Sequence, residues 1–169
     1  MKILIIAGTG SGCALETASV MAEELTSLGH EVHVKNATDS PSPEGYGAVF
    51  AGSGVRAGKW HKSLRSWMKQ HAPALRGKPL AVFTLCLMMR DPEKHAKEIL
   101  EISDGVLRKL DLTPVSTGLF PGWYFAERFG LLERLILKMM KTPRGDFRDL
   151  DAIRTWTRDT AGRIVPTGS

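Results

Sequence analysis

Apolar runs of strand length recur along the chain and alternate with amphipathic segments. Continuous apolar runs at 2–7 (KILIIA), 47–52 (GAVFAG) and 79–87 (PLAVFTLCL) predict parallel strands that are covered on both faces. The alternating segment 31–35 (EVHVK) predicts an outer strand, and 115–119 predicts a fifth strand.

Amphipathic segments of helical period separate these strands. We expect helices over 14–28, 60–71, 92–109 and 150–164, the first of which is ended by Gly29. Alternating strands and helices predict an α/β fold, a doubly wound five-stranded parallel sheet in the order 2-1-3-4-5.

Length and composition limit the architecture further. A chain of 169 residues that is 43% hydrophobic predicts a single domain over 1–169, with a helical insertion after the fifth strand at about 121–149. The apolar start runs directly into a glycine loop, and no apolar stretch approaches the roughly 18 residues that cross a bilayer, so we expect a cytoplasmic protein. Cys13 and Cys86 are too few for a disulfide framework, and we expect no metal site.

Positive charge is concentrated in one part of the chain. Residues 56–97 hold ten Lys and Arg against Asp91 and Glu93, a local balance of +8 within an overall +5. This concentration indicates an anionic partner, such as a small carboxylate or phosphate ligand, anionic lipid or nucleic acid. The alternative is a solvated surface with no partner.

Two glycine-containing loops follow neighbouring strands of the predicted sheet. The segment 7–18 (AGTGSGCALETA) ends the first strand, and 52–61 (GSGVRAGKWH) ends the third. In this strand order, ligands bind beyond the carboxyl ends of the strands, at the switch point between strands one and three. We therefore expect the two loops to frame one site.

The first loop has features of a phosphate-binding loop. Cys13 and Ala14 stand where a P-loop needs Lys and Ser or Thr, which excludes that motif. The dinucleotide fingerprint starts at Gly8 but has a cysteine in place of its third glycine, and the second strand ends in Lys35 and Asn36 instead of an acid for the ribose. What remains are the hydroxyls of Thr9 and Ser11 and successive N–H groups at a helix start, which bind a phosphate monoester without metal or lysine.

This loop carries a resemblance to a known family. Residues 9–14 resemble the flavodoxin phosphate loop, T-x-[ST]-G-x-T, and depart from it at Ala14, which removes one hydrogen bond worth about 1.5–3 kcal/mol. Residues 52–61 resemble the third-strand loop of the flavodoxin-type menaquinone-dependent protoporphyrinogen oxidases, G-[AS]-[SG]-[IV]-R-x-G-x-[YW]-H. The likeness continues at 90–94 (RDPEK) and covers nearly the whole chain.

The resemblance implies FMN as cofactor and oxidation of protoporphyrinogen IX to protoporphyrin IX with a quinone as acceptor. It implies that the flavin lies against Thr9, Gly10, Ser11, Gly12, Cys13, Ala14, Ser53, Gly54, Val55, Arg56, Ala57, Gly58, Lys59, Trp60, Thr84, Leu85, Cys86, Leu87, Met88 and Met89. The side chains that could pair with the propionates of the anionic substrate are Arg56, Lys59, His61 and Arg90.

Several of these residues have a second interpretation. Arg56 and His61 are candidates for a catalytic role, the histidine as a proton relay, although the reaction does not require a general base because the flavin carries the chemistry. Trp60 would stack on the flavin or be the first core residue of a helix, and Met88 and Met89 would be flavin-side residues or apolar filler. Cys13, at a helix start, would have a lowered pKa and could be a redox thiol.

The predicted insertion contains an amphipathic segment, 123–141 (WYFAERFGLLERLILKMMK). Its apolar residues form a wide arc bordered by Arg and Lys: Phe125, Phe129, Leu132, Leu135, Ile136, Met139 and Met140. This pattern predicts an interfacial helix that lies on the inner membrane surface, where quinone dissolves, or a helix that packs on its own domain or on a second copy in a homodimer.

Three other functions fit parts of the pattern. A flavodoxin-like FMN electron carrier would act without small-molecule turnover, but carriers of this kind present acidic surfaces and this chain is basic there. A flavin-free module that binds anions or nucleic acid would use the basic segment alone. An NAD(P)H-dependent quinone reductase is a further alternative. We favour the FMN oxidoreductase, with no nucleic acid as partner.

Overall fold

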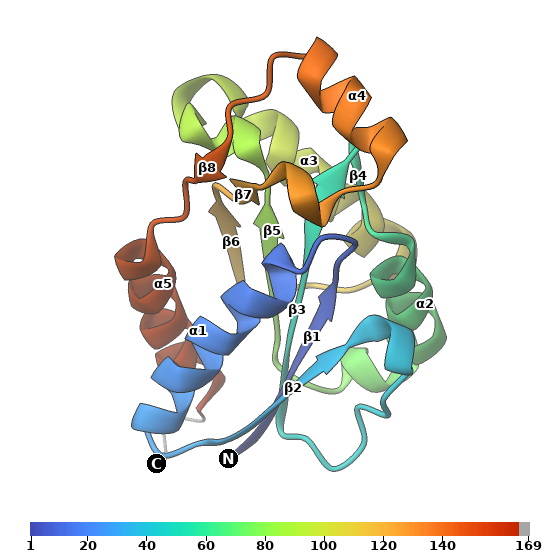
Figure 1. Ribbon diagram of the computed structural model, residues 1–169. Coiled ribbons are helices and arrows are strands. Elements are labelled where there is room, and N and C mark those ends of the chain that lie inside the picture. The colour runs from blue at the N-terminus through green and yellow to red at the C-terminus, as the bar shows by residue number, and fades with distance from the viewer. Residues whose placement is uncertain (166–169) are drawn as a thin grey trace.

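A five-stranded parallel sheet forms the centre of the molecule. The computed structural model of the chain describes residues 1–165. Its strands run in the order β2-β1-β3-β5-β6, which confirms the predicted doubly wound topology (Figure 1). Their bounds are β1 (Lys2–Gly8), β2 (Glu31–Asn36), β3 (Ala48–Arg56), β5 (Leu80–Leu85) and β6 (Ser116–Phe120).

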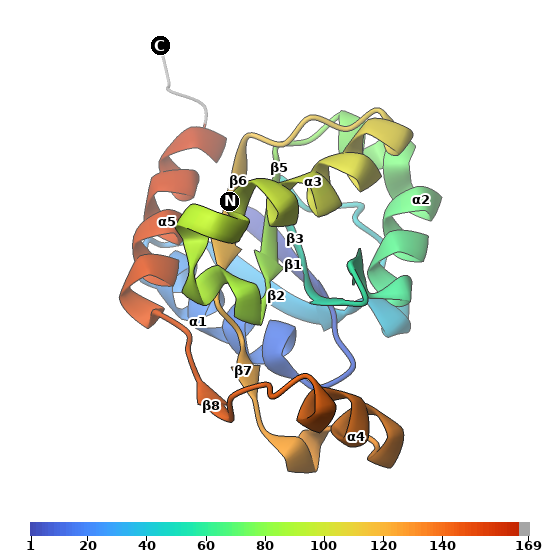
Figure 2. The same cartoon turned by 90° about the horizontal axis from the view of Figure 1, so that it is seen from above.

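Helices cover both faces of this sheet. On one face lie α1 (Cys13–Ser27) and α5 (Leu150–Ile164), and on the other lie α2 (Lys62–Arg76) and α3 (Pro92–Leu110) (Figure 2). Burial from both sides explains why the central strands are apolar without alternation. Consecutive residues of β1 point alternately into the two cores, Ile3 and Ile5 toward α1 and Leu4 and Ile6 toward α2.

The α2 helix departs from its predicted bounds at both ends. It begins at Lys62 because Trp60 belongs to a short strand, β4 (Lys59–Trp60), which folds back antiparallel on the end of β3. It continues past the predicted end at residue 71 to Arg76 and contains Pro73. Burial of Ala72 and Leu75 on the core offsets the hydrogen bond that the proline removes.

The insertion after β6 is not one helix over 123–141. It consists of β7 (Trp123–Tyr124), a 3₁₀ turn at Ala126–Arg128, helix α4 (Leu131–Met139) and β8 (Gly145–Asp146), which pairs antiparallel with β7. The predicted arc is therefore divided, because residues 125 and 129 pack against the core while the apolar residues of α4 stay exposed. Among residues 1–165, no helix has the length and apolarity needed to span a bilayer.

Candidate functional site

A cavity of about 1150 Å³ opens at the carboxyl ends of the strands, beneath the insertion. It is lined by the loop after β1, by the β3–β4 hairpin, by the segment after β5 and by α4 with the chain that follows it. Figure 1 shows α4 at this end of the molecule. The two predicted loops thus meet at one site, and the insertion closes a further side of it.

The loop after β1 is held by its own side chain. The backbone N–H of Gly12 donates to Thr9 Oγ1 at 2.8 Å, and Gly12 adopts a φ of +100° as it starts α1. Because Thr9 accepts this bond, its O–H is left to donate toward the cavity. Ala14 lies below the loop, fully buried in the core, so its methyl group does not line the cavity.

Arg56 lies across this loop. A Cβ at Gly10 would come within 3.1 Å of Arg56 Nη1, so the glycine is what allows the guanidinium to approach so closely. The same group is 2.6 Å from Glu133 Oε1 on α4 and lies 4.6 Å from the ring centroid of Phe129. One guanidinium therefore connects the phosphate loop, the hairpin and the insertion.

Two fully buried hydroxyls fasten the hairpin to the sheet. Ser53 Oγ donates to the carbonyl of Gly54 at 2.7 Å and accepts from the N–H of His61 at 2.8 Å. Thr84 Oγ1 accepts from the indole N–H of Trp60 at 2.9 Å, and Trp60 is only 1% exposed. This arrangement supports the interpretation of Trp60 as a core residue. Ser53 and Thr84 shape the cavity wall from behind, and neither lines the cavity.

His61 begins the α2 helix and faces the cavity. Its Nδ1 accepts from the N–H of Ser63 at 3.3 Å and lies 2.7 Å from the hydroxyl of the same residue. Burial lowers the pKa of His61, and the charges of Arg56 and Arg65 lower it further. The ring is therefore neutral near pH 7 and carries its proton on Nε2, where it can donate a hydrogen bond but brings no charge to a carboxylate.

The cavity wall is strongly basic. Two acidic residues line it, Asp91 and Glu133, against six basic ones: Arg56, Lys59, Lys62, Arg65, Arg90 and Lys141. Arg90 donates from Nε to the carbonyl of Leu87 at 3.1 Å and lies 4.9 Å from the ring centroid of Phe147. The predicted substrate residues 56, 59, 61 and 90 thus share one cavity, and its potential favours anions.

The segment after β5 contributes one apolar wall. Leu85, Cys86, Leu87 and Met88 line the cavity, and Met88 is 38% exposed. Met89 is buried against Cys86 and Ile99 and does not line it. The interpretation as apolar filler therefore describes Met89, whereas Met88 lines the cavity.

The predicted low pKa of Cys13 is wrong. Burial raises the pKa of this thiol to about 11, outweighing the hydrogen bond to the backbone of Trp123 and the charge of Arg148 that lower it. Cys13 packs in the core at the first turn of α1, so desolvation exceeds any stabilisation from the helix start. The thiol is neutral at physiological pH.

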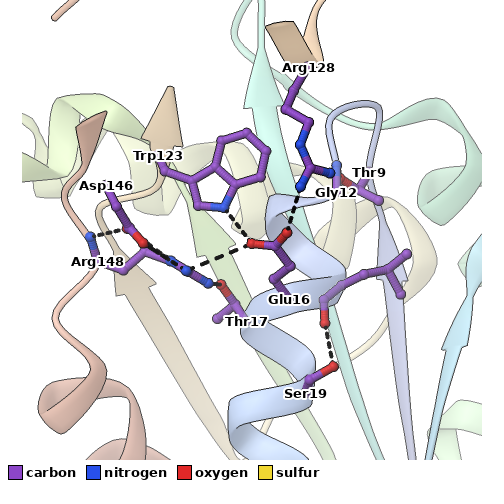
Figure 3. Close-up of polar contacts among 10 residues, drawn as sticks. Thr9, Gly12, Glu16, Thr17, Ser19, Trp123, Arg128, Asp146 and Arg148 are labelled. Atoms are coloured by element: carbon purple, nitrogen blue, oxygen red, sulfur yellow. Dashed lines mark hydrogen bonds and ion pairs between the residues drawn. The ribbon is translucent and has the colours of Figure 1, made fainter. Parts of the chain in front are cut away.

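A second polar cluster beside the loop was missed by the sequence analysis. Glu16 Oε2 accepts from the indole N–H of Trp123 at 3.0 Å, and the Glu16 carboxylate lies 3.5 Å from Arg128 and 3.8 Å from Arg148 (Figure 3). Arg148 is also paired with Asp146 at 2.8 Å. No local pattern indicates this cluster, because its carboxylate at the start of α1 is more than a hundred positions away from its partners.

A doubly wound sheet with a hydroxyl-bearing loop at its switch point defines a flavodoxin-like protein. The model of the flavodoxin domain family matches residues 4–151, so the chain belongs to that family. The chain is 28% identical over 151 residues to protoporphyrinogen IX dehydrogenase [quinone] of Escherichia coli K12, covering 88% of this chain and 83% of that protein.

Further comparisons extend this likeness. The protein of the same name from Leishmania major is 24% identical over 125 residues, which are 69% of this chain and 54% of that protein. Among solved structures, oxidised flavodoxin 1 of Bacillus cereus has a TM-score of 0.65 at 16% sequence identity. The superposition covers 98% of this chain and 100% of that one. At that identity the structural likeness concerns the fold.

Proposed function

We propose that this protein is an FMN-dependent oxidoreductase that converts protoporphyrinogen IX to protoporphyrin IX and passes the electrons to a quinone. The observation that carries the proposal is the cavity itself, which joins a phosphate-binding loop to a rim of basic side chains. The name of the Escherichia coli relative supports the substrate and the acceptor.

The residues present fit a flavin mononucleotide. Thr9, Ser11 and the N–H groups at the start of α1 form a cradle for a phosphate monoester, and a glycine at position 10 admits the Arg56 guanidinium beside it. At about 1150 Å³ the cavity is larger than the roughly 300–1000 Å³ of a typical small-ligand site. It therefore offers space for a substrate next to the cofactor.

The protein contributes binding and orientation to this reaction. A bound flavin would supply the oxidation chemistry, and each electron pair removed from the substrate reduces one quinone to a quinol. Lys59 of β4 and Arg90 of the segment after β5 both line the cavity and would hold propionate groups of the substrate. His61 would donate from Nε2 without adding charge, as its lowered pKa requires.

An electron carrier without substrate turnover is the second candidate. The fold supports an electron carrier as much as an enzyme, because the chain has the fold of the flavodoxins. The basic rim argues for the enzyme, since a carrier that docks basic partners needs an acidic surface around its cofactor.

Turnover decides between these candidates. FMN-loaded protein, given protoporphyrinogen IX and a menaquinone analogue without oxygen, is expected to produce porphyrin fluorescence. Arg90→Met should raise KM for the porphyrinogen about tenfold, because one charge-assisted contact to a propionate is lost. Lys35→Met removes an equal charge from exposed β2, outside the cavity, and should leave KM unchanged. Flavin-loaded protein without turnover would remove the enzyme assignment and favour the carrier.

We propose further that α4 places the protein on the inner membrane surface, where quinone dissolves. Six large apolar residues in and directly after this helix are 49–83% exposed, namely Leu131, Leu132, Leu135, Ile136, Met139 and Met140. Lys138 and Lys141 stand among them and favour anionic lipid over a second copy of the chain. Ile136 and Met140 also line the cavity, so the apolar surface continues into it.

A further inference from the structure

We infer that Arg128 of the insertion and Arg56 form a clamp of two guanidinium groups over the phosphate loop. This clamp selects FMN, which carries a phosphate, over riboflavin, which does not. This inference deepens the proposed function and rests on it. The pattern of the phosphate loop, residues 9–14, contains neither arginine. Arg128 is also not among the residues that the resemblance places against the flavin.

The two arginines reach the loop from separate elements. Arg56 comes from the end of β3 and lies against Gly10, where a Cβ would be 3.1 Å from its Nη1. Arg128 comes from the 3₁₀ turn of the insertion and lies against Gly12, where a Cβ would be 3.7 Å from its Nη1. Figure 3 shows the Arg128 side chain reaching toward Gly12 and Thr9. The two guanidinium groups therefore approach the loop at two of its residues, Gly10 and Gly12.

Each arginine is held at the loop by a carboxylate. Arg56 pairs with Glu133 at 2.6 Å, and Arg128 pairs with Glu16 at 3.5 Å. The Arg128 guanidinium also lies 5.7 Å from the ring centroid of Trp123. These contacts keep the two cations beside the cradle, so a phosphate that enters meets donors already in place.

Glu16 makes a cation at this position necessary. Its carboxylate stands in the first turn of α1, beside the cradle, and would repel a phosphate dianion. Trp123 and Arg148 hold Glu16 independently of Arg128, with the Trp123 bond at 3.0 Å and the Arg148 side chain only 11% exposed. Glu16 therefore keeps two other partners when Arg128 donates to a phosphate.

The clamp also accounts for the departure of this loop from the flavodoxin pattern. Residue 14 supplies no hydroxyl to the phosphate, and its side chain is buried in the core. Charge-assisted hydrogen bonds from a guanidinium are stronger than those from a neutral hydroxyl, and a guanidinium can bind two phosphate oxygens at once. Two arginines thus replace one lost hydroxyl.

The test compares FMN with riboflavin, which lacks the phosphate. Dissociation constants are measured by quenching of flavin fluorescence, at low and at moderate salt. For Arg128→Met we expect the Kd for FMN to rise at least about tenfold, with the Kd for riboflavin unchanged and a weaker salt dependence for FMN. Arg128→Lys should recover part of the loss. Arg144→Met removes an equal charge from the insertion at a residue that pairs with Glu127, and should change neither constant.

The dissociation constants of Arg128→Met for FMN and for riboflavin decide whether the clamp exists. An unchanged ratio of the two dissociation constants in Arg128→Met would overturn the clamp while leaving flavin binding and the proposed function intact. A parallel weakening of both flavins would also overturn it, since Arg128 would then act on the whole insertion; thermal unfolding of each variant shows whether the fold is retained. A wild-type protein that binds neither flavin would defeat the clamp together with the proposed function.

Discussion

At the scale of single residues, burial decides the chemistry of the titratable side chains around the cavity. His61 and Cys13 both occupy positions where sequence patterns suggest reactivity. Burial lowers the pKa of the histidine and raises the pKa of the thiol, so both groups are neutral near pH 7. The positive charge that Arg and Lys bring to the cavity wall is therefore not supplemented by His61.

The pKa of Cys13 predicts slow alkylation. In a Cys86→Ala variant, which leaves one thiol, iodoacetamide should react with folded protein at pH 8 roughly a hundredfold more slowly than with unfolded protein. The reason is that the thiolate fraction falls tenfold for each unit by which the pKa, about 11 here, exceeds that of an ordinary thiol. The rate should rise steeply toward pH 11. Equal rates for folded and unfolded protein at pH 8 would contradict the raised pKa.

At the scale of elements, backbone conformation separates glycines that the fold requires from glycines that it tolerates. The β3–β4 hairpin turns through Ala57 and Gly58, both with positive φ, at +48° and +69°. Such a pair of positive φ angles matches the twist of a tight hairpin. Gly105, by contrast, lies inside α3 with no atom near the position of a Cβ.

Substitution of these two glycines by alanine should have opposite effects. Gly58→Ala is expected to lower the free energy of unfolding by about 1–2 kcal/mol, because a Cβ is strained in the left-handed region. Gly105→Ala should raise it by about 1 kcal/mol through helix propensity. Urea unfolding of both variants measures the differences. A Gly58→Ala protein as stable as wild type would mean that the hairpin does not hold this turn in solution.

At the scale of the whole molecule, the insertion joins a packed domain to an exposed apolar helix. Its first part is anchored, since Trp123 is buried in the core and donates to Glu16. Its second part, α4, has no buried residue and is attached to the domain through contacts such as Arg56 to Glu133. An exposed apolar surface of this kind is typical of an interaction site.

Vesicle binding tests the membrane contact of α4. The protein should sediment with vesicles that contain phosphatidylglycerol and much less with vesicles of phosphatidylcholine alone. The reason is that Lys138 and Lys141 each contribute about 1 kcal/mol of binding free energy at an anionic surface. The double substitution Leu131→Gln and Leu132→Gln should reduce binding about tenfold or more, as apolar burial is lost.

Leu28, an exposed apolar residue far from α4 in the sequence, provides the control for the vesicle experiment. Leu28→Gln alters an equally apolar residue that is 43% exposed at the end of α1 and should leave vesicle binding unchanged. Sedimentation of the free protein shows its oligomeric state. A dimer that the α4 double substitution dissociates, without vesicle binding by the wild type, would assign this face to a second copy instead.

The pattern of the sequence predicted that the loops after β1 and β3 meet, because this depends only on where the strands end. Thr9 follows β1 and Arg56 ends β3, and because these parallel strands are neighbours, their order brings the two residues together. It predicted α2 less well, because Trp60 has the apolar spacing of a helix but is held in β4 by its bond to Thr84. Periodicity alone does not distinguish a helix start from a short strand packed on the same core.

What the sequence determined by itself is the sheet, its order and the position of the glycine-containing loop after β1, because these follow from local periodicity and from the rules of parallel α/β connections. What only the tertiary structure decided is how the insertion meets that loop. Arg56 and Glu133 are 77 positions apart, and Trp123 and Glu16 are 107 apart. Contacts over such separations depend on how complete elements pack, and no local pattern of residues specifies them.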